Sequence, residues 1–128
     1  MKEWLKAAGG KLVYYGLGSS GAQQYYNEKS GGSKLGMVRG YGALNPKEDM
    51  STYMEFIARG DYSKLGKLMA SKDWGNRVGK KVQLLKKYKF ITQYQLARIQ
   101  EAHAKEVTRQ VLQDQKEILK SLELGKLK

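Results

Sequence analysis

The sequence predicts a mainly α-helical protein with a glycine-rich, partly extended N-terminal region and a long C-terminal helix. Ten of the fifteen glycines lie between Gly9 and Gly42, whereas apolar residues recur at helical spacing after residue 45. A length of 128 residues fits one domain with a modest core. We therefore expect a single domain over residues 1–128, comprising a glycine-rich region at 1–45, a helical core at 46–91 and a long helix at 92–128.

The glycine-rich region predicts only short elements. Residues 1–8 fit a short helix that the glycine pair at positions 9 and 10 would end. Residues 11–15 favour a short strand or extended segment, and residues 22–28 favour a helical turn.

The clearest predicted helix runs from Pro46 to Arg59. Asn45 is a good N-cap, Pro46 suits the first helical position, and Gly60 suits the position just after a helix end. Within the helix, apolar residues recur at i, i+3, i+4 and i+7 and form one stripe: Met50, Tyr53, Met54 and Ile57.

Three more helices are expected downstream. Asp61 could cap a short one, Asp73 could cap one that runs to about Tyr88, and Thr92 could cap the longest, from Gln93 to about Leu122. The longest helix carries an apolar stripe over its first half, but beyond Val111 its apolar residues drift toward another face. Its C-terminal half therefore either projects and meets a partner or a second copy, or forms a solvated tail.

The chain is strongly basic, with a net charge of +12 from 24 basic and 12 acidic residues. Such an excess favours polyanions through counterion release, and it equally suits an ordinary solvated surface. The densest basic cluster, a candidate site for nucleic acid or another polyanion, would form one exposed side of the third helix and the turn after it. It comprises Arg77, Lys80, Lys81, Lys86, Lys87 and Lys89.

Residues 40–57 carry the most specific motif, in which Tyr41 leads through a short turn into a helix with Glu48 in its first turn. This segment resembles the second half of the active site of gluzincin zinc metallopeptidases, such as the anthrax lethal factor-like enzymes and related zinc-peptidase lipoproteins. The resemblance covers roughly residues 35–100. It implies that Glu48 is the third zinc ligand and that Tyr41 stabilises the oxyanion. Thr52 departs from the pattern, because many relatives carry a second glutamate there.

The rest of that active site is missing from the chain. In this family the other two zinc ligands come from a His-Glu-x-x-His motif on an upstream helix. The single histidine here, His103, lies far downstream on the apolar stripe of the last helix, where we expect a core residue. Capping alone offers another explanation of Glu48, since a carboxylate three residues after Asn45 can bond back to the backbone of the cap.

We therefore expect an incomplete or degenerate zinc-metallopeptidase-like domain that is non-catalytic as it stands. It would act as a binding or structural element, or as half of a split peptidase, and would use zinc only with an upstream His-Glu-x-x-His segment. The alternative is a basic accessory protein that binds nucleic acid, a ribonucleoprotein or a virion assembly. The absence of cysteine and of long apolar runs excludes disulfides and favours a cytoplasmic protein without a membrane partner.

Overall fold

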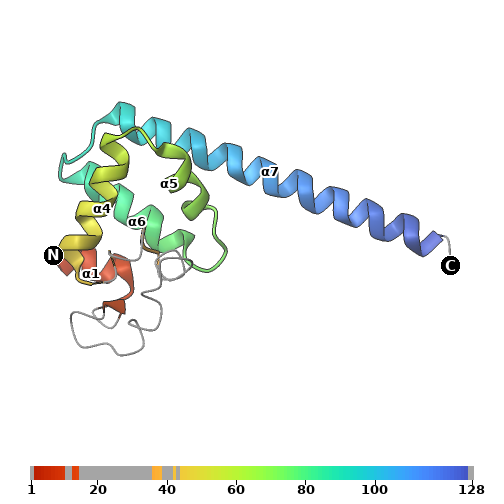
Figure 1. The fold of residues 1–128 in the computed structure, drawn as a ribbon, viewed down its shortest axis with the longest axis horizontal. Helices are drawn as coiled ribbons and strands as arrows, with labels where there is room; N and C mark the ends of the chain where they lie inside the picture. Colours follow the sequence, from red (N-terminus) through yellow and green to blue (C-terminus); the bar gives the residue numbers. More distant parts are fainter. Residues whose placement is uncertain (1, 11–12, 15–35, 39–41, 43, 127–128) are drawn as a thin grey trace.

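The computed structural model describes residues 2–10, 13–14, 36–38, 42 and 44–126. These residues form five helices and no strand, which confirms the predicted mainly α fold with a long C-terminal helix (Figure 1). Most of the glycine-rich region lies outside the described residues. This includes all of the predicted turn at 22–28 and most of the predicted extended segment at 11–15. The helices are α1 (Lys2–Ala8), α4 (Pro46–Ala58), α5 (Tyr62–Met69), α6 (Gly75–Lys87) and α7 (Gln93–Lys126).

Local sequence signals set several of the helix ends. The Asn45 side chain accepts a hydrogen bond from the Glu48 amide at 2.8 Å, so the predicted cap of α4 is confirmed. Gly60 ends α4 with a φ of 74°, and the Asp61 amide bonds back to the Phe56 carbonyl at 2.9 Å, as in a Schellman motif. At the start of α7, the Gln95 amide donates to the Thr92 hydroxyl, and the Thr92 amide donates to the Gln95 side-chain oxygen. This is the reciprocal pattern of a capping box.

Two predicted caps are wrong. Neither Asp61 before α5 nor Asp73 before α6 caps its helix through its side chain, and α6 begins only after Trp74. Ser71 performs part of this role instead, because its hydroxyl accepts bonds from the amides of Asp73 and Trp74. Aspartate favours the N-cap by residue type, but before α6 the turn places the Ser71 hydroxyl within reach of these amides instead.

A single apolar core joins the described helices. Helix α1 packs against α6, and α5 lies between α6 and α7. The predicted stripe of α4 faces the core: Tyr53 and Ile57 are buried, and Met50 and Met54 pack partly buried against them. Other fully or nearly fully buried members are Trp4, Tyr14, Met37, Leu65, Val78, Val82, Leu85 and Ile99.

Helices α5 and α7 touch at backbone distance. A Cβ atom built on Gly66 of α5 would lie 2.6 Å from the carbonyl carbon of Ala102 and 2.7 Å from the amide nitrogen of His103 in α7. No side chain fits in that space, so glycine is required where the two helices cross.

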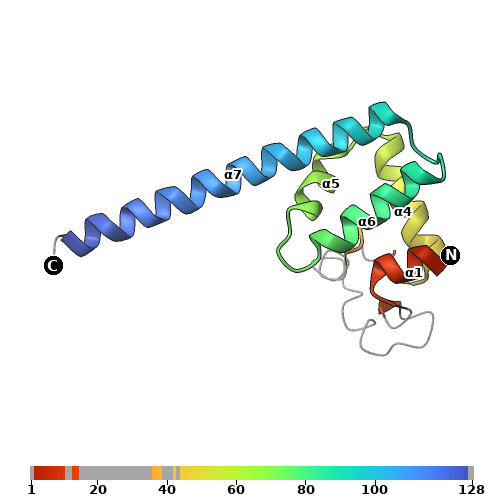
Figure 2. The same ribbon diagram turned by 180° about the vertical axis from the view of Figure 1, so that it is seen from behind.

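Helix α7 has two unlike halves. Its first part packs on the globular part of the protein through the buried Leu96 and Ile99, whereas every residue from Val111 to Gly125 is exposed (Figures 1 and 2). The predicted long C-terminal helix is therefore confirmed, and it continues past Leu122 to Lys126. None of the described helices is both long and apolar enough to cross a membrane.

Candidate functional site

Asp49, in the first turn of α4, is the centre of a buried polar cluster. Its Oδ2 atom lies 2.7 Å from the Nζ of Lys81 in α6, and both side chains are fully buried. The same oxygen accepts hydrogen bonds from the Tyr14 hydroxyl at 2.6 Å and from the Trp4 indole at 3.1 Å. We call Trp4, Tyr14, Asp49 and Lys81 the Asp49 cluster. It joins α1, α4 and α6 to the segment at residue 14.

The Lys81 ammonium has partners on its other sides as well. It donates to the Gly36 carbonyl at 3.0 Å, and the Tyr53 hydroxyl donates to the same carbonyl at 2.7 Å. It also lies 5.7 Å from the centre of the Trp4 ring and 5.3 Å from that of Tyr53, within range of cation–π attraction. A buried ammonium is stable only with such partners. Together with the Gly36 carbonyl, the Asp49 cluster therefore connects five separated segments of the chain.

Burial and pairing act in opposite directions on the two charges. Burial raises the pKa of Asp49 and lowers that of Lys81, because both charged forms lose water. The ion pair and the hydrogen bonds from Tyr14 and Trp4 oppose these shifts and favour the charged forms. With both side chains fully buried, the Asp49 cluster stabilises the fold and offers no accessible acid or base.

Glu48, the neighbour of Asp49 in the first turn of α4, differs from it in burial and in hydrogen bonding. It is half-buried, and its carboxylate makes no hydrogen bond or ion pair with the described part of the chain. Its own amide donates to Asn45, but the reciprocal bond of a capping box, from the Asn45 amide to the Glu48 carboxylate, is not formed. Within the described part of the chain, capping thus accounts for Asn45 but not for the Glu48 side chain.

Neither Tyr41 nor the single histidine can be placed beside Glu48 from the described structure. Tyr41 lies outside the described residues. His103 is half-buried in α7 and lines a groove with Met69 and Lys80, to which Glu48 does not contribute. Across the described ranges, no three His, Cys, Asp or Glu residues are grouped as metal ligands would be.

The predicted basic cluster is divided by the structure. The assignment of Lys81 to an exposed basic side is wrong, because Lys81 is fully buried against Asp49. Arg77 is half-buried and stacks on the Trp74 ring at 4.4 Å, and Lys87 pairs with Glu3 at 3.0 Å. Arg77 and three of the five lysines have no acidic partner in the described structure. These lysines are Lys80 and Lys89, which are exposed, and Lys86, which is half-buried.

The sequence contained a signal for the buried pair. Lys81 stands three residues after Val78 and four before Leu85, so it lies on the apolar stripe of α6 rather than away from it. Asp49 likewise stands four residues before the buried Tyr53. Two opposite charges, each on the apolar side of its own helix, predict a buried ion pair when they are read together.

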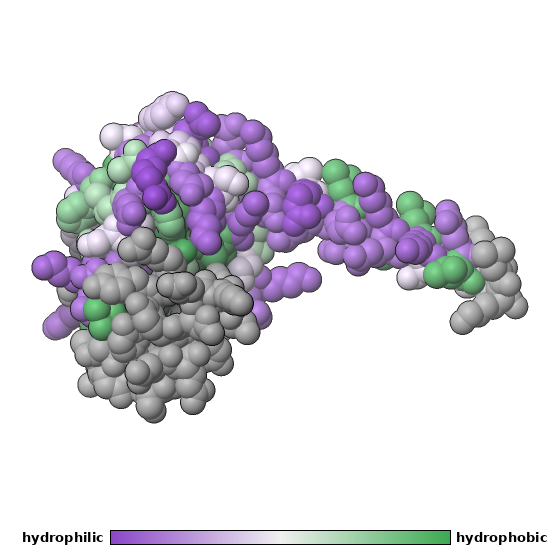
Figure 3. Space-filling model, in the orientation of Figure 1, coloured by the Kyte–Doolittle hydropathy of each residue, from purple (hydrophilic) through white to green (hydrophobic). Residues whose placement is uncertain are grey.

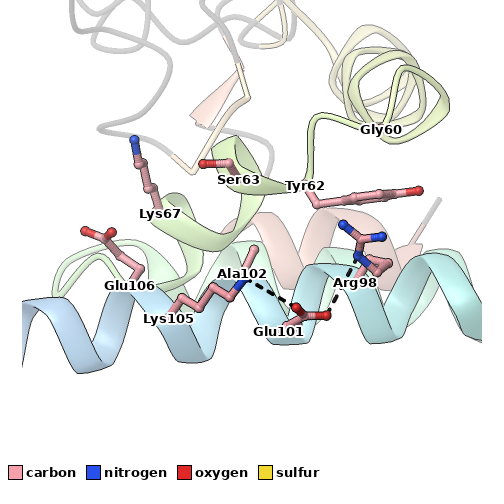
Figure 4. Close-up of a pocket in the computed structure, with 9 residues that line it drawn as sticks. All are labelled: Gly60, Tyr62, Ser63, Lys67, Arg98, Glu101, Ala102, Lys105 and Glu106. Carbon is pink, nitrogen blue, oxygen red and sulfur yellow. Dashed lines mark ion pairs between the residues drawn. The ribbon is translucent and has the colours of Figure 1, made fainter.

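A separate hollow of about 380 Å³ lies between the start of α5 and α7 (Figure 4). Arg98 lies beneath the Tyr62 ring, 5.4 Å from its centre, and Glu101 pairs with Arg98 at 3.8 Å and with Lys105 at 3.4 Å. The walls thus carry charges of both signs, and Glu101 pairs with two of the three cations. Its other lining residues are Gly60, Ser63, Lys67, Ala102 and Glu106.

Comparison with known proteins gives no significant match, whether to a family model, to a curated protein or to a solved structure. The gluzincin resemblance of residues 35–100 therefore stays a prediction. It rests on the motif around Tyr41 and Glu48.

Proposed function

We propose that this chain is a zinc-metallopeptidase-like module that supplies Glu48 to a zinc site completed by another segment, and that it has no peptidase activity by itself. The observation that carries the proposal is the half-exposed carboxylate of Glu48 in the first turn of α4, which makes no hydrogen bond or ion pair with the described part of the chain. Carboxylate oxygen is a common zinc ligand, and a carboxylate without a protein partner can bind the metal without first losing one.

The neighbouring Asp49 explains how Glu48 would be held. Asp49 is tied to Lys81, Tyr14 and Trp4, which fixes the rotation of the first turn of α4. Glu48 follows from that rotation, since successive residues of a helix are about 100° apart. Positioning residues of this kind orient metal ligands in many sites, so Asp49 would act on zinc binding only through Glu48.

The chain cannot complete the site alone, because it has a single histidine and the predicted site needs two. By the family resemblance, the missing segment would carry His-Glu-x-x-His, and Tyr41 would donate a hydrogen bond to the oxyanion. No catalytic step is assigned to the residues of this chain without that segment.

The first test is the DNA that precedes the codon for Met1. We expect a reading frame there, either continuous with this chain or in a neighbouring gene, that encodes His-Glu-x-x-His. A flanking sequence without that motif would leave Glu48 without partner ligands and would overturn the proposal.

The second test is metal analysis after dialysis of the protein that contains both segments. We expect one zinc per complex, loss of that zinc in Glu48→Gln, and retention of zinc with slower turnover in Tyr41→Phe. Glu55→Gln is the matched control, because Glu55 lies two turns further along the same helix. Equal zinc content in wild type and Glu48→Gln would show that Glu48 is not a ligand.

A second candidate, polyanion binding, is favoured by the three lysines that lack an acidic partner in the described structure: Lys80, Lys86 and Lys89. If they bind nucleic acid, affinity falls steeply with salt, and changing all three to Glu abolishes binding. The matched control changes Lys64, Lys67 and Lys72 to Glu, which alters the net charge equally on another exposed surface. Equal losses in both triple variants would indicate a non-specific effect of net charge.

A further inference from the structure

We propose that two copies of this chain associate as a parallel dimer through the projecting half of α7. The inference does not depend on Glu48 or on zinc. It rests on an exposed apolar stripe, on the charges that flank this stripe and on the position of the globular part.

The stripe consists of large apolar side chains that the chain itself leaves uncovered. At about 100° per residue, they occupy an arc of about 140° on one side of α7. Figure 3 shows apolar residues gathered along one edge of the projecting helix. The members are Val107, Val111, Leu112, Ile118, Leu119 and Leu122, with exposed fractions from 40% to 59%.

The spacing of the stripe suits a partner helix. Val111 and Ile118, and likewise Leu112 and Leu119, are seven residues apart, while Ile118 and Leu122 are four apart. Intervals of four and seven residues keep side chains on the seam between two supercoiled helices. Gln115 lies in the middle of the stripe and is the polar residue that two facing copies would pair with each other.

Charges of opposite sign flank the stripe. Asp114 stands at one edge of the stripe and Lys116 at the other, roughly 90° and 110° from its centre, while Glu117 and Lys120 lie further round on their respective sides. Glu123, on the same side as Lys116, is the exception near the end. In a parallel pair, each flank of one helix meets the opposite flank of its partner, so acid meets base. In an antiparallel pair, each flank meets its own equivalent, so like charges face each other. The flanks therefore favour a second copy in parallel orientation.

The globular part leaves room for this partner. It contacts α7 through Leu96, Ile99 and His103, whose side of the helix is roughly 130° away from the centre of the stripe. In Figure 1 the helices of the globular part lie on one side of α7. Two copies joined along the stripe would therefore carry the described helices of their globular parts away from the seam.

Sedimentation of the full chain over a range of concentrations tests the association. We expect a reversible monomer–dimer equilibrium, and we expect Leu122→Glu to weaken it at least about tenfold, because an unpaired carboxylate would be buried at the seam. The matched control is Leu124→Glu, a leucine of similar exposure on the opposite, charged side of α7. The circular dichroism of the globular part should be unchanged in both variants, which excludes misfolding. A monomer at all concentrations, or equal effects of the two variants, would overturn the proposal.

A cysteine cross-link tests the orientation. The natural chain has no cysteine, so Thr108→Cys introduces the single reactive site. In a parallel dimer the two introduced thiols lie side by side and oxidise to a covalent dimer. In an antiparallel dimer each thiol lies near residue 122 of the other copy, too far to form a disulfide. A reversible dimer that does not cross-link through this site would rule out the parallel arrangement.

Discussion

The globular part of this protein buries charged side chains, whereas the projecting half of α7 exposes apolar ones. In the globular part, two full charges are buried, yet each has a partner within hydrogen-bond distance. In the projecting half, large apolar side chains are about half exposed. Both regions are helical and have mixed composition. Whether a side chain on a helix is buried therefore depends on the other segments that pack against it, and not on the helix alone.

The largest effect in the globular part is expected from Lys81→Met. This change leaves Asp49 as a buried charge without its ammonium, at an expected cost of about 3–5 kcal/mol in the free energy of unfolding. Urea unfolding followed by circular dichroism measures it. The control is Lys80→Met at the exposed neighbouring position, with an expected change within about 0.5 kcal/mol. Similar costs for the two variants would show that the ion pair does not stabilise the fold.

The contact between α5 and α7 marks the boundary between the two regions. Gly66→Ala should destabilise the protein by about 1–3 kcal/mol, because its Cβ would overlap the backbone at Ala102. Gly79→Ala in α6 is the control, since a Cβ there meets nothing within 4 Å. Alanine is the better helix former, so Gly79→Ala should stabilise by about 0.5–1 kcal/mol. Thermal unfolding of the two variants compares these opposite signs, and a stabilising Gly66→Ala would refute the close crossing.

Two substitutions at the start of α4 distinguish a role in helix capping from a role in ligand binding. Asn45→Ala should cost about 1 kcal/mol through loss of its bond to the Glu48 amide. Glu48→Gln should leave the free energy of unfolding almost unchanged, because the Glu48 carboxylate has no partner in the described structure. Chemical unfolding of both variants is the measurement. A cost for Glu48→Gln as large as that for Asn45→Ala would restore the capping-box explanation of Glu48.

The smallest effect is expected on the projecting side. Truncation after Gln110 removes no buried side chain, so the free energy of unfolding of the globular part should change by less than about 0.5 kcal/mol. The comparison belongs at protein concentrations low enough to keep the full chain monomeric. A large loss of stability would mean that the two regions are coupled in a way that their contacts do not show.

Most of the helical framework was predictable from the sequence because its determinants are local. Asn45 and Thr92 lie within three residues of the amides they cap, and Gly60 adopts a backbone conformation that other residues rarely take. The apolar spacing of α4 likewise predicted which side of the helix faces the core. These interactions lie within one or two helical turns, so a single stretch of sequence contains both partners.

The candidate site was predictable only in part. The sequence singled out Glu48, with zinc binding and a capping box as two explanations, and it placed Lys81 on an exposed surface. Tertiary structure decided otherwise, because the partners of Lys81 lie at residues 4, 36, 49 and 53, far away along the chain. The same holds for Gly66, whose need for glycine comes from the backbone of Ala102. Local hydrogen bonds and periodicity thus determined the helices, whereas segments distant in sequence determined which charges are buried and which apolar side chains stay exposed.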